Sequence, residues 1–103
     1  MGIAVFTAEG AVVAWSDRFI EALELSQPLA GMSVDGVIST LAHRGDLGAG
    51  APWDLAGREI ARAAAAGEAE TALTLPSGRR ATLTWHAVPG GGTILCALPA
   101  AAP

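Results

Sequence analysis

Three residues of the chain are the ones best suited to metal binding or nucleophilic chemistry: His43, His86 and Cys96. Their spacing matches no zinc motif, because such motifs place ligands in pairs only a few residues apart. A single cysteine also excludes a disulfide within the chain. We expect His43 at the end of a helix, His86 on a strand at the surface, and Cys96 as a small apolar residue in an apolar strand. The sequence therefore predicts no metal site and no cofactor.

The remaining chemical motifs are equally weak. Ser16, Ser33 and Ser77 stand at expected cap or turn positions, and no Gly-x-Ser-x-Gly elbow is present. The glycine run 90–92 precedes a strand rather than a helix, so it lacks the amide cluster that holds phosphate. No acid, base and nucleophile converge in the pattern, and we predict that the protein is not an enzyme.

Length limits the chain of 103 residues to a single domain, which we place at 1–98, with a flexible Ala/Pro tail at 99–103. The longest apolar runs fall far short of the roughly 20 residues that a membrane span needs. The first residues contain no basic segment followed by a long apolar run, so no signal peptide is expected. We predict a cytoplasmic protein with no membrane partner.

Charge and composition restrict the partners further. The net charge is −4, and all six basic residues are arginines that are spread along the chain. This distribution argues against binding to nucleic acid. Hydrophobic residues make up 51% and charged residues 16%, which indicates an apolar surface and hence a protein partner.

Hydrophobic periodicity predicts two strands, three helices and three strands along the chain. Their expected ranges are 2–7, 11–15, 17–25, 34–43, 53–66, 71–75, 80–88 and 93–98. Ser16 or Asp17 is expected to cap the first helix and Ser33 the second.

The third helix has its own predicted pattern. We expect an apolar face of Trp53, Ala56, Ile60 and Ala63, and an ion pair between Asp54 and Arg58 on the outside.

Burial patterns predict how the strands are arranged. Strands 2–7 and 93–98 are apolar on both faces, whereas 71–75 and 80–88 alternate, so the two terminal strands should pair at the centre of the sheet. The helices should cover one face and leave the other open. Strand 11–15 is apolar although it lies at an edge, and we expect it to be covered. Its residues Val12, Val13 and Trp15 are the predicted dimer face.

Several segments together resemble a PAS domain of the kind found in bacterial sensor histidine kinases. They are 2–6, 13–19, the loop 44–48 (Arg-Gly-Asp-Leu-Gly), the turn 76–79 (Pro-Ser-Gly-Arg) and the turn 89–92. The resemblance implies an α+β, profilin-like fold whose five-stranded antiparallel sheet has the order 2-1-5-4-3, with helices on one face. Family members usually carry Asn at the position of Ser16 and Asp at that of Ser77, and both replacements keep a local capping oxygen. The threonine-aspartate motif that usually follows the last strand is missing here.

The resemblance also implies a function and its alternatives. We expect a non-enzymatic sensory and interaction module that forms a homodimer and regulates a partner such as a histidine kinase. One alternative is a sensor that holds a small molecule between helices and sheet, in a pocket lined by Ile38, Leu41, Trp53, Ile60, Leu83 and Trp85. A second alternative is a profilin-like or roadblock-like scaffold, from which strand order would distinguish it.

Overall fold

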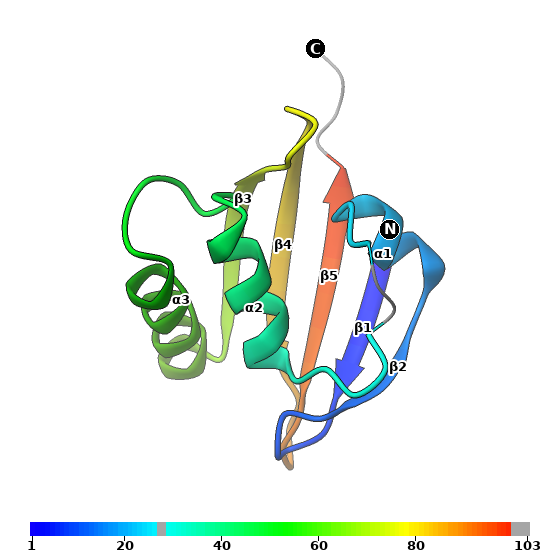
Figure 1. Cartoon of the computed structure of the whole chain (residues 1–103). Helices are drawn as coiled ribbons and strands as arrows, with labels where there is room; N and C mark the ends of the chain where they lie inside the picture. Colours follow the sequence, from blue (N-terminus) through cyan, green and yellow to red (C-terminus); the bar gives the residue numbers. More distant parts are fainter. Residues whose placement is uncertain (27–28, 100–103) are drawn as a thin grey trace.

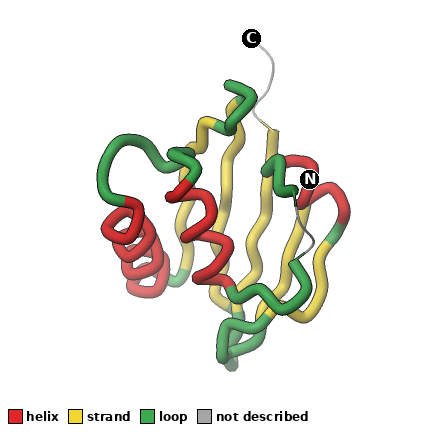
Figure 2. The backbone as a smooth tube through the Cα atoms, in the orientation of Figure 1, coloured by secondary structure: helices red, strands yellow, loops and turns green. Residues whose placement is uncertain are grey.

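The computed structural model, which describes residues 1–26 and 29–99, has two layers: an antiparallel sheet and a layer of helices packed on one of its faces (Figures 1 and 2). The elements are β1 (Gly2–Phe6), β2 (Val12–Trp15), α1 (Asp17–Ala22), α2 (Val34–His43), α3 (Pro52–Ala66), β3 (Glu68–Thr74), β4 (Arg80–Ala87) and β5 (Thr93–Pro99). The sheet has the order β2-β1-β5-β4-β3, with every pair antiparallel. All three helices lie on one side of it, as Figure 1 shows. The predicted architecture is confirmed.

The two terminal strands form the centre of the sheet. β1 pairs with β5 from Gly2 opposite Ala97 to Phe6 opposite Thr93. Side chains on the helix side of these strands, such as Ala4 and Leu95, are fully buried. The opposite side of these strands is not buried to the same extent, since Ile3 and Leu98 are each 39% exposed. The apolar pattern on both faces therefore predicted the central position of β1 and β5 correctly, but only the helix side forms the core.

Local sequence signals explain where the helices begin and end. The Ser33 hydroxyl oxygen accepts a hydrogen bond from the Gly36 amide at 3.0 Å and so caps α2 as predicted. α3 has a proline in its first turn and ends at Gly67, which adopts the left-handed conformation with φ 77°. α1 and α2 contribute Phe19 and Leu41 to the core, and both are fully buried.

Ser16 acts differently from the prediction. It occupies the N-cap position of α1, but its side chain makes no capping hydrogen bond. Its hydroxyl oxygen instead accepts a hydrogen bond from the Ile3 amide at 3.1 Å, and its own amide donates to the Ile3 carbonyl at 2.9 Å. The side chain extends the β1–β2 pairing because the helix begins directly at the end of β2.

Two further corrections concern α3 and β3. Trp53 does not join the buried face of α3: it points about 60–80° away from the direction of Ala56 and Ala63, and it is 72% exposed. Asp54 and Arg58 form no ion pair. β3 begins at Glu68 instead of residue 71, because the turn at Gly67 lets pairing with β4 start at once.

Candidate functional site: the open face of the sheet

The face of the sheet opposite the helices carries an apolar patch at its centre. Register places five of its members on β1 and β5, because they alternate with the buried residues of those strands: Ile3, Val5, Ile94, Cys96 and Leu98. On β2, Ala14 is paired with Val5, and Val13 is the extra residue of the register irregularity beside it; both complete the set. Val13 is 62% exposed, and Ile3 and Leu98 are each 39% exposed. We call this set the outer apolar patch. An apolar set of this kind on an open sheet face is typical of a contact surface.

The same face becomes polar toward β3. Along β4 the outward residues opposite β5 are Thr82, Thr84 and His86. On β3 the residues paired with Thr84 and His86 are Glu70 and Glu68. They line a shallow hollow of about 270 Å³ with Ala69. The outer face is therefore apolar on one half and acidic on the other.

Both edges of the sheet are partly covered. On β3, the Glu70 carbonyl accepts a hydrogen bond from Arg62 at 3.3 Å, and the Thr74 amide donates to the Asp46 carbonyl at 3.2 Å. On β2, the Val12 amide donates to the Met32 carbonyl at 3.3 Å, which covers the start of this strand, whereas Val13 is 62% exposed. Backbone groups that are already bonded cannot pair with another strand, and this leaves the face as the more accessible surface.

The residues predicted as the dimer face do not all point the same way. Val13 lies in the outer apolar patch. Val12 and Trp15 are paired with Phe6 and Ala4, and they pack against the core on the helix side. An irregularity in the β1–β2 register puts Val12 and Trp15 on the same side although they are three residues apart.

Five of the six residues predicted to line a pocket lie together between sheet and helices. Ile38, Leu41, Leu83 and Trp85 are buried in the core, and Ile60 packs against it. Trp53 stands apart on the outer side of α3. The structure thus places these five as packed core residues.

The three residues with metal or thiol chemistry are not brought together. His86 and Cys96 are both on the outer face, on neighbouring strands but out of register, since His86 is paired with Ile94 and Cys96 with Thr84. His43 ends α2 on the helix side, where its Nδ1 lies 2.8 Å from the Ser39 carbonyl oxygen.

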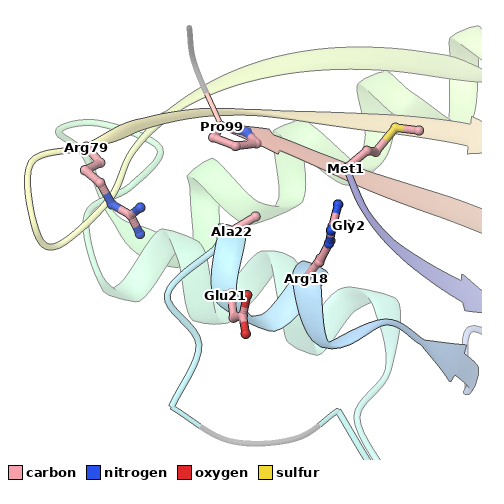
Figure 3. A pocket seen from close by; sticks show the side chains of 7 residues that line it. All are labelled: Met1, Gly2, Arg18, Glu21, Ala22, Arg79 and Pro99. Atoms are coloured by element: carbon pink, nitrogen blue, oxygen red, sulfur yellow. The ribbon is translucent and has the colours of Figure 1, made fainter. Parts of the chain in front are cut away.

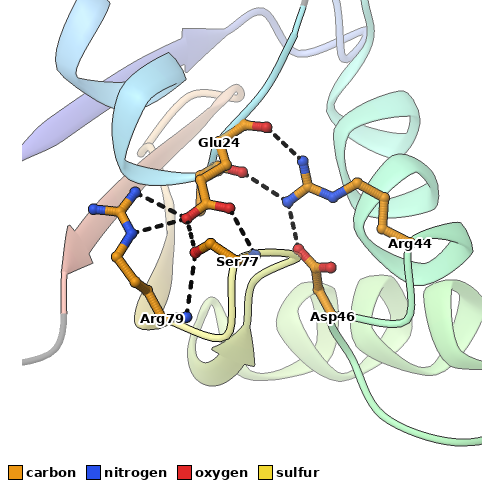
Figure 4. A network of polar contacts seen from close by, with 6 residues as sticks. Glu24, Arg44, Asp46, Ser77 and Arg79 are labelled. Atoms are coloured by element: carbon orange, nitrogen blue, oxygen red, sulfur yellow. Dashed lines mark hydrogen bonds and ion pairs between the residues drawn. The ribbon is translucent and has the colours of Figure 1, made fainter.

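A polar cluster fastens the turn between β3 and β4 to the segment after α1 (Figure 4). The Glu24 carboxylate accepts hydrogen bonds from the Ser77 amide at 3.1 Å and the Ser77 hydroxyl at 2.5 Å. Arg79 donates to the same carboxylate from Nε at 2.9 Å. The hydrogen bond from the Ser77 side chain, together with Arg79, lowers the pKa of Glu24 against the opposing effect of burial.

A second part of the cluster connects the end of α2 to the same segment. Arg44 donates to the carbonyl oxygens of Leu23 and Glu24 at 2.7 and 2.8 Å and pairs with Asp46 at 2.5 Å. Asp46 is only 4% exposed, so this is the buried ion pair of the described residues. Through Arg44, the pair holds the loop after α2 to the segment 23–24, about 20 residues earlier in the chain.

An open hollow of about 300 Å³ lies where the sheet ends beside α1, lined among others by Arg18, Arg79 and Pro99 (Figure 3). The two arginines lie on opposite sides of Ala22, and the Glu21 carboxylate points away from Pro99. This hollow lies outside the helix–sheet core.

Sequence reasoning missed Glu24, Arg44 and Asp46 as a group. The loop containing Arg44 and Asp46 was visible as a motif, but nothing local indicates that Glu24 would reach a turn 53 residues away.

An open five-stranded antiparallel sheet with helices on one face and a short first hairpin defines a small α+β class. A family model described as the PAS fold matches residues 1–97. The chain belongs to the PAS family. The alternative of a scaffold of the profilin or roadblock type is set aside. No curated protein and no solved structure matches the chain. Within residues 1–26 and 29–99, no helix has the length and apolar character needed to cross a membrane.

Proposed function

We propose that this PAS domain is a non-enzymatic sensory and interaction module of bacterial signal transduction, acting in the cytoplasm. It works as a homodimer and regulates a histidine kinase or a similar signalling partner. The observation that carries the proposal is the outer apolar patch on the open sheet face. PAS membership supports the general role of a sensory or interaction module.

Burial of the patch supplies the free energy for association. Apolar area removed from water contributes about 25 cal/mol per Å², before the costs of association are counted. Leu98 and Ile3 are exposed enough for a second copy to cover them. Because the sheet edges are partly bonded already, contact through the face is favoured over strand addition. The acidic half of the face carries Glu68 and Glu70, and repulsion between these carboxylates in two copies keeps the contact to the apolar half.

Signalling follows from a shift between dimer arrangements. A signal or partner that binds one arrangement more tightly increases the population of that arrangement by its differential affinity. The kinase partner then responds to the arrangement of the pair. In this mechanism the domain needs no catalytic group.

Sedimentation velocity at micromolar concentration tests the proposal. We expect a dimer for the wild-type domain and a monomer for Leu98→Lys, since a buried lysine without a partner charge opposes association. Ala72→Lys is the matched control, because Ala72 is exposed on the polar half of the same face. A monomeric wild type, or a dimer that tolerates Leu98→Lys and Val13→Lys, contradicts the proposal.

The kinase part of the proposal has its own measurement. The domain and its Leu98→Lys variant should differ in their effect on the autophosphorylation rate of a purified partner histidine kinase. Equal effects of the two would remove dimerisation from the mechanism.

A further inference from the structure

Trp53 is the most exposed large apolar side chain in the described part of the chain, at 72%. It stands in the first turn of α3, and α3 lies at the outside of the helical layer, away from the outer apolar patch (Figure 1). Tryptophan is the residue type most enriched among those that dominate binding energy at protein interfaces. The surface of α3 around this exposed indole is therefore a candidate contact surface.

The exposed residues next to Trp53 on α3 have small side chains or none. One and two turns further along the same side of α3 come Gly57 and Ala61, and Ala64 follows; all three are exposed. A Cβ added at Gly57 would meet no atom within 4 Å. α3 thus presents an exposed indole and, next to it, three exposed positions with small or no side chains.

The charges on this side are also unpaired within the described residues. Asp54 and Arg58 are exposed and form no ion pair, although they are one turn apart. Their neighbours Glu59 and Arg62 are bonded to each other at 2.9 Å and also contact Thr71 on β3. Asp54 and Arg58 are the charges of α3 left for an external partner.

These features complement one another when two copies of α3 lie antiparallel. Residues 54 and 58 are equally distant from residue 56, so a twofold axis level with residue 56 sets each Asp54 beside the Arg58 of the other copy. The same axis sets Trp53 level with residue 59 of the other copy, between Gly57 and Ala61. A large side chain then enters a space between small ones, which is the packing that antiparallel helix pairs use.

We propose that α3 is a second association surface, on which a second copy of this chain docks in antiparallel orientation with Trp53 seated over Gly57 and Ala61. The contact is self-complementary, as a twofold interface requires. Helix pairs of 15 residues bury little area, so the association is weak. This inference does not depend on the sheet-face dimer, because the two surfaces share no residue.

Sedimentation equilibrium up to near-millimolar concentration tests the proposal in the Leu98→Lys background, in which the outer apolar patch is disabled. We expect weak self-association that Gly57→Gln reduces at least tenfold, because the added side chain occupies the space in which Trp53 of the other copy would lie. Ala65→Gln is the matched control: it adds the same side chain at an exposed position of α3, two turns beyond Arg58 and outside the proposed contact. Gly57→Gln should fold normally, because the site has free space and glycine is a poor helix former.

The charge pair gives an independent measurement. Asp54→Arg and Arg58→Asp should each weaken the association, and the double variant should restore it. A strictly monomeric Leu98→Lys protein overturns the α3 proposal while leaving the sheet-face dimer intact. Self-association that is insensitive to Gly57→Gln and to Trp53→Ala overturns it as well.

Discussion

The Ser77 hydroxyl donates a hydrogen bond to the Glu24 carboxylate at 2.5 Å, across 53 positions of the sequence. Glu24 also adopts a left-handed backbone conformation, with φ 52°, that is uncommon for residues other than glycine. The hydrogen bonds that the Glu24 carboxylate accepts from Ser77 and Arg79 offset the free-energy cost of this backbone conformation. The contact joins the hairpin turn of β3 and β4 to the segment that follows α1.

Replacing Glu24 by glutamine should destabilise the domain at neutral pH, because the amide keeps the size but loses the charge that accepts from Arg79 and Ser77. The lowered pKa of Glu24 in the folded state means that its stabilising effect is present above the ordinary glutamate pKa. That effect is lost as pH falls through the lowered folded-state pKa. Urea unfolding at neutral and acid pH should therefore show a stability gap between wild type and variant that closes in acid.

Glu21→Gln is the control for this measurement. Glu21 lies in the same region and is exposed, and its carboxylate makes no side-chain hydrogen bond in the described structure. Its variant should match the wild type at both pH values. A gap between Glu24→Gln and wild type that stays constant with pH would show that the charge of Glu24 is not involved.

The ion pairs Arg44–Asp46 and Arg62–Glu59 should differ strongly in their contribution to stability. Asp46 is buried, and Asp46→Ala leaves the Arg44 charge without its carboxylate, a change that costs about 3–5 kcal/mol for a buried pair. Glu59→Ala breaks an exposed pair and should cost about 1 kcal/mol or less. Chemical denaturation of both variants measures the difference, and equal costs would contradict the assignment of Arg44–Asp46 as the structural pair.

Two glycines should respond to alanine in opposite directions. At Gly2 a Cβ would lie 2.3 Å from the backbone of Phe19, so β1 or α1 must move, and overpacking of this kind costs about 1–3 kcal/mol. At Gly57 a Cβ meets open space, and alanine should stabilise α3 by about 1 kcal/mol. Thermal unfolding of the two variants decides this, and a neutral Gly2→Ala would mean that the first residues of β1 can shift freely.

The sheet could be predicted because its signals are local. The segments of β1 and β5 are apolar on both faces, which predicts them at the centre of the sheet, and turn residues mark where each strand ends. The start of β3 was missed because residues 68–70 are Glu-Ala-Glu, which has low strand propensity. Pairing with β4 overrides that propensity in the folded chain.

Side-chain roles were harder to predict than elements. Helical spacing predicts Trp53 on the apolar side of α3, whereas in the structure Trp53 is exposed and Leu55 packs against the core. Which of the two is buried depends on where α2 packs against α3, and hydrophobic periodicity carries no information about that position. The sequence predicts Ser16 or Asp17 as the cap of α1, but the Ser16 hydroxyl accepts from the Ile3 amide instead, because Ser16 directly follows β2. Such choices are made by tertiary packing and not by local pattern.

Cys96 provides a direct probe of the proposed sheet-face dimer. Its side chain is half-buried in the outer apolar patch, directly opposite Ile3 on β1. A second copy over the patch would shield the thiol, so its rate of reaction with a bulky disulfide reagent should fall as protein concentration rises. The Leu98→Lys variant should react at one rate throughout, because its patch stays uncovered. A wild-type rate that does not depend on concentration, measured across the range in which sedimentation shows a dimer, would place the contact elsewhere on the molecule.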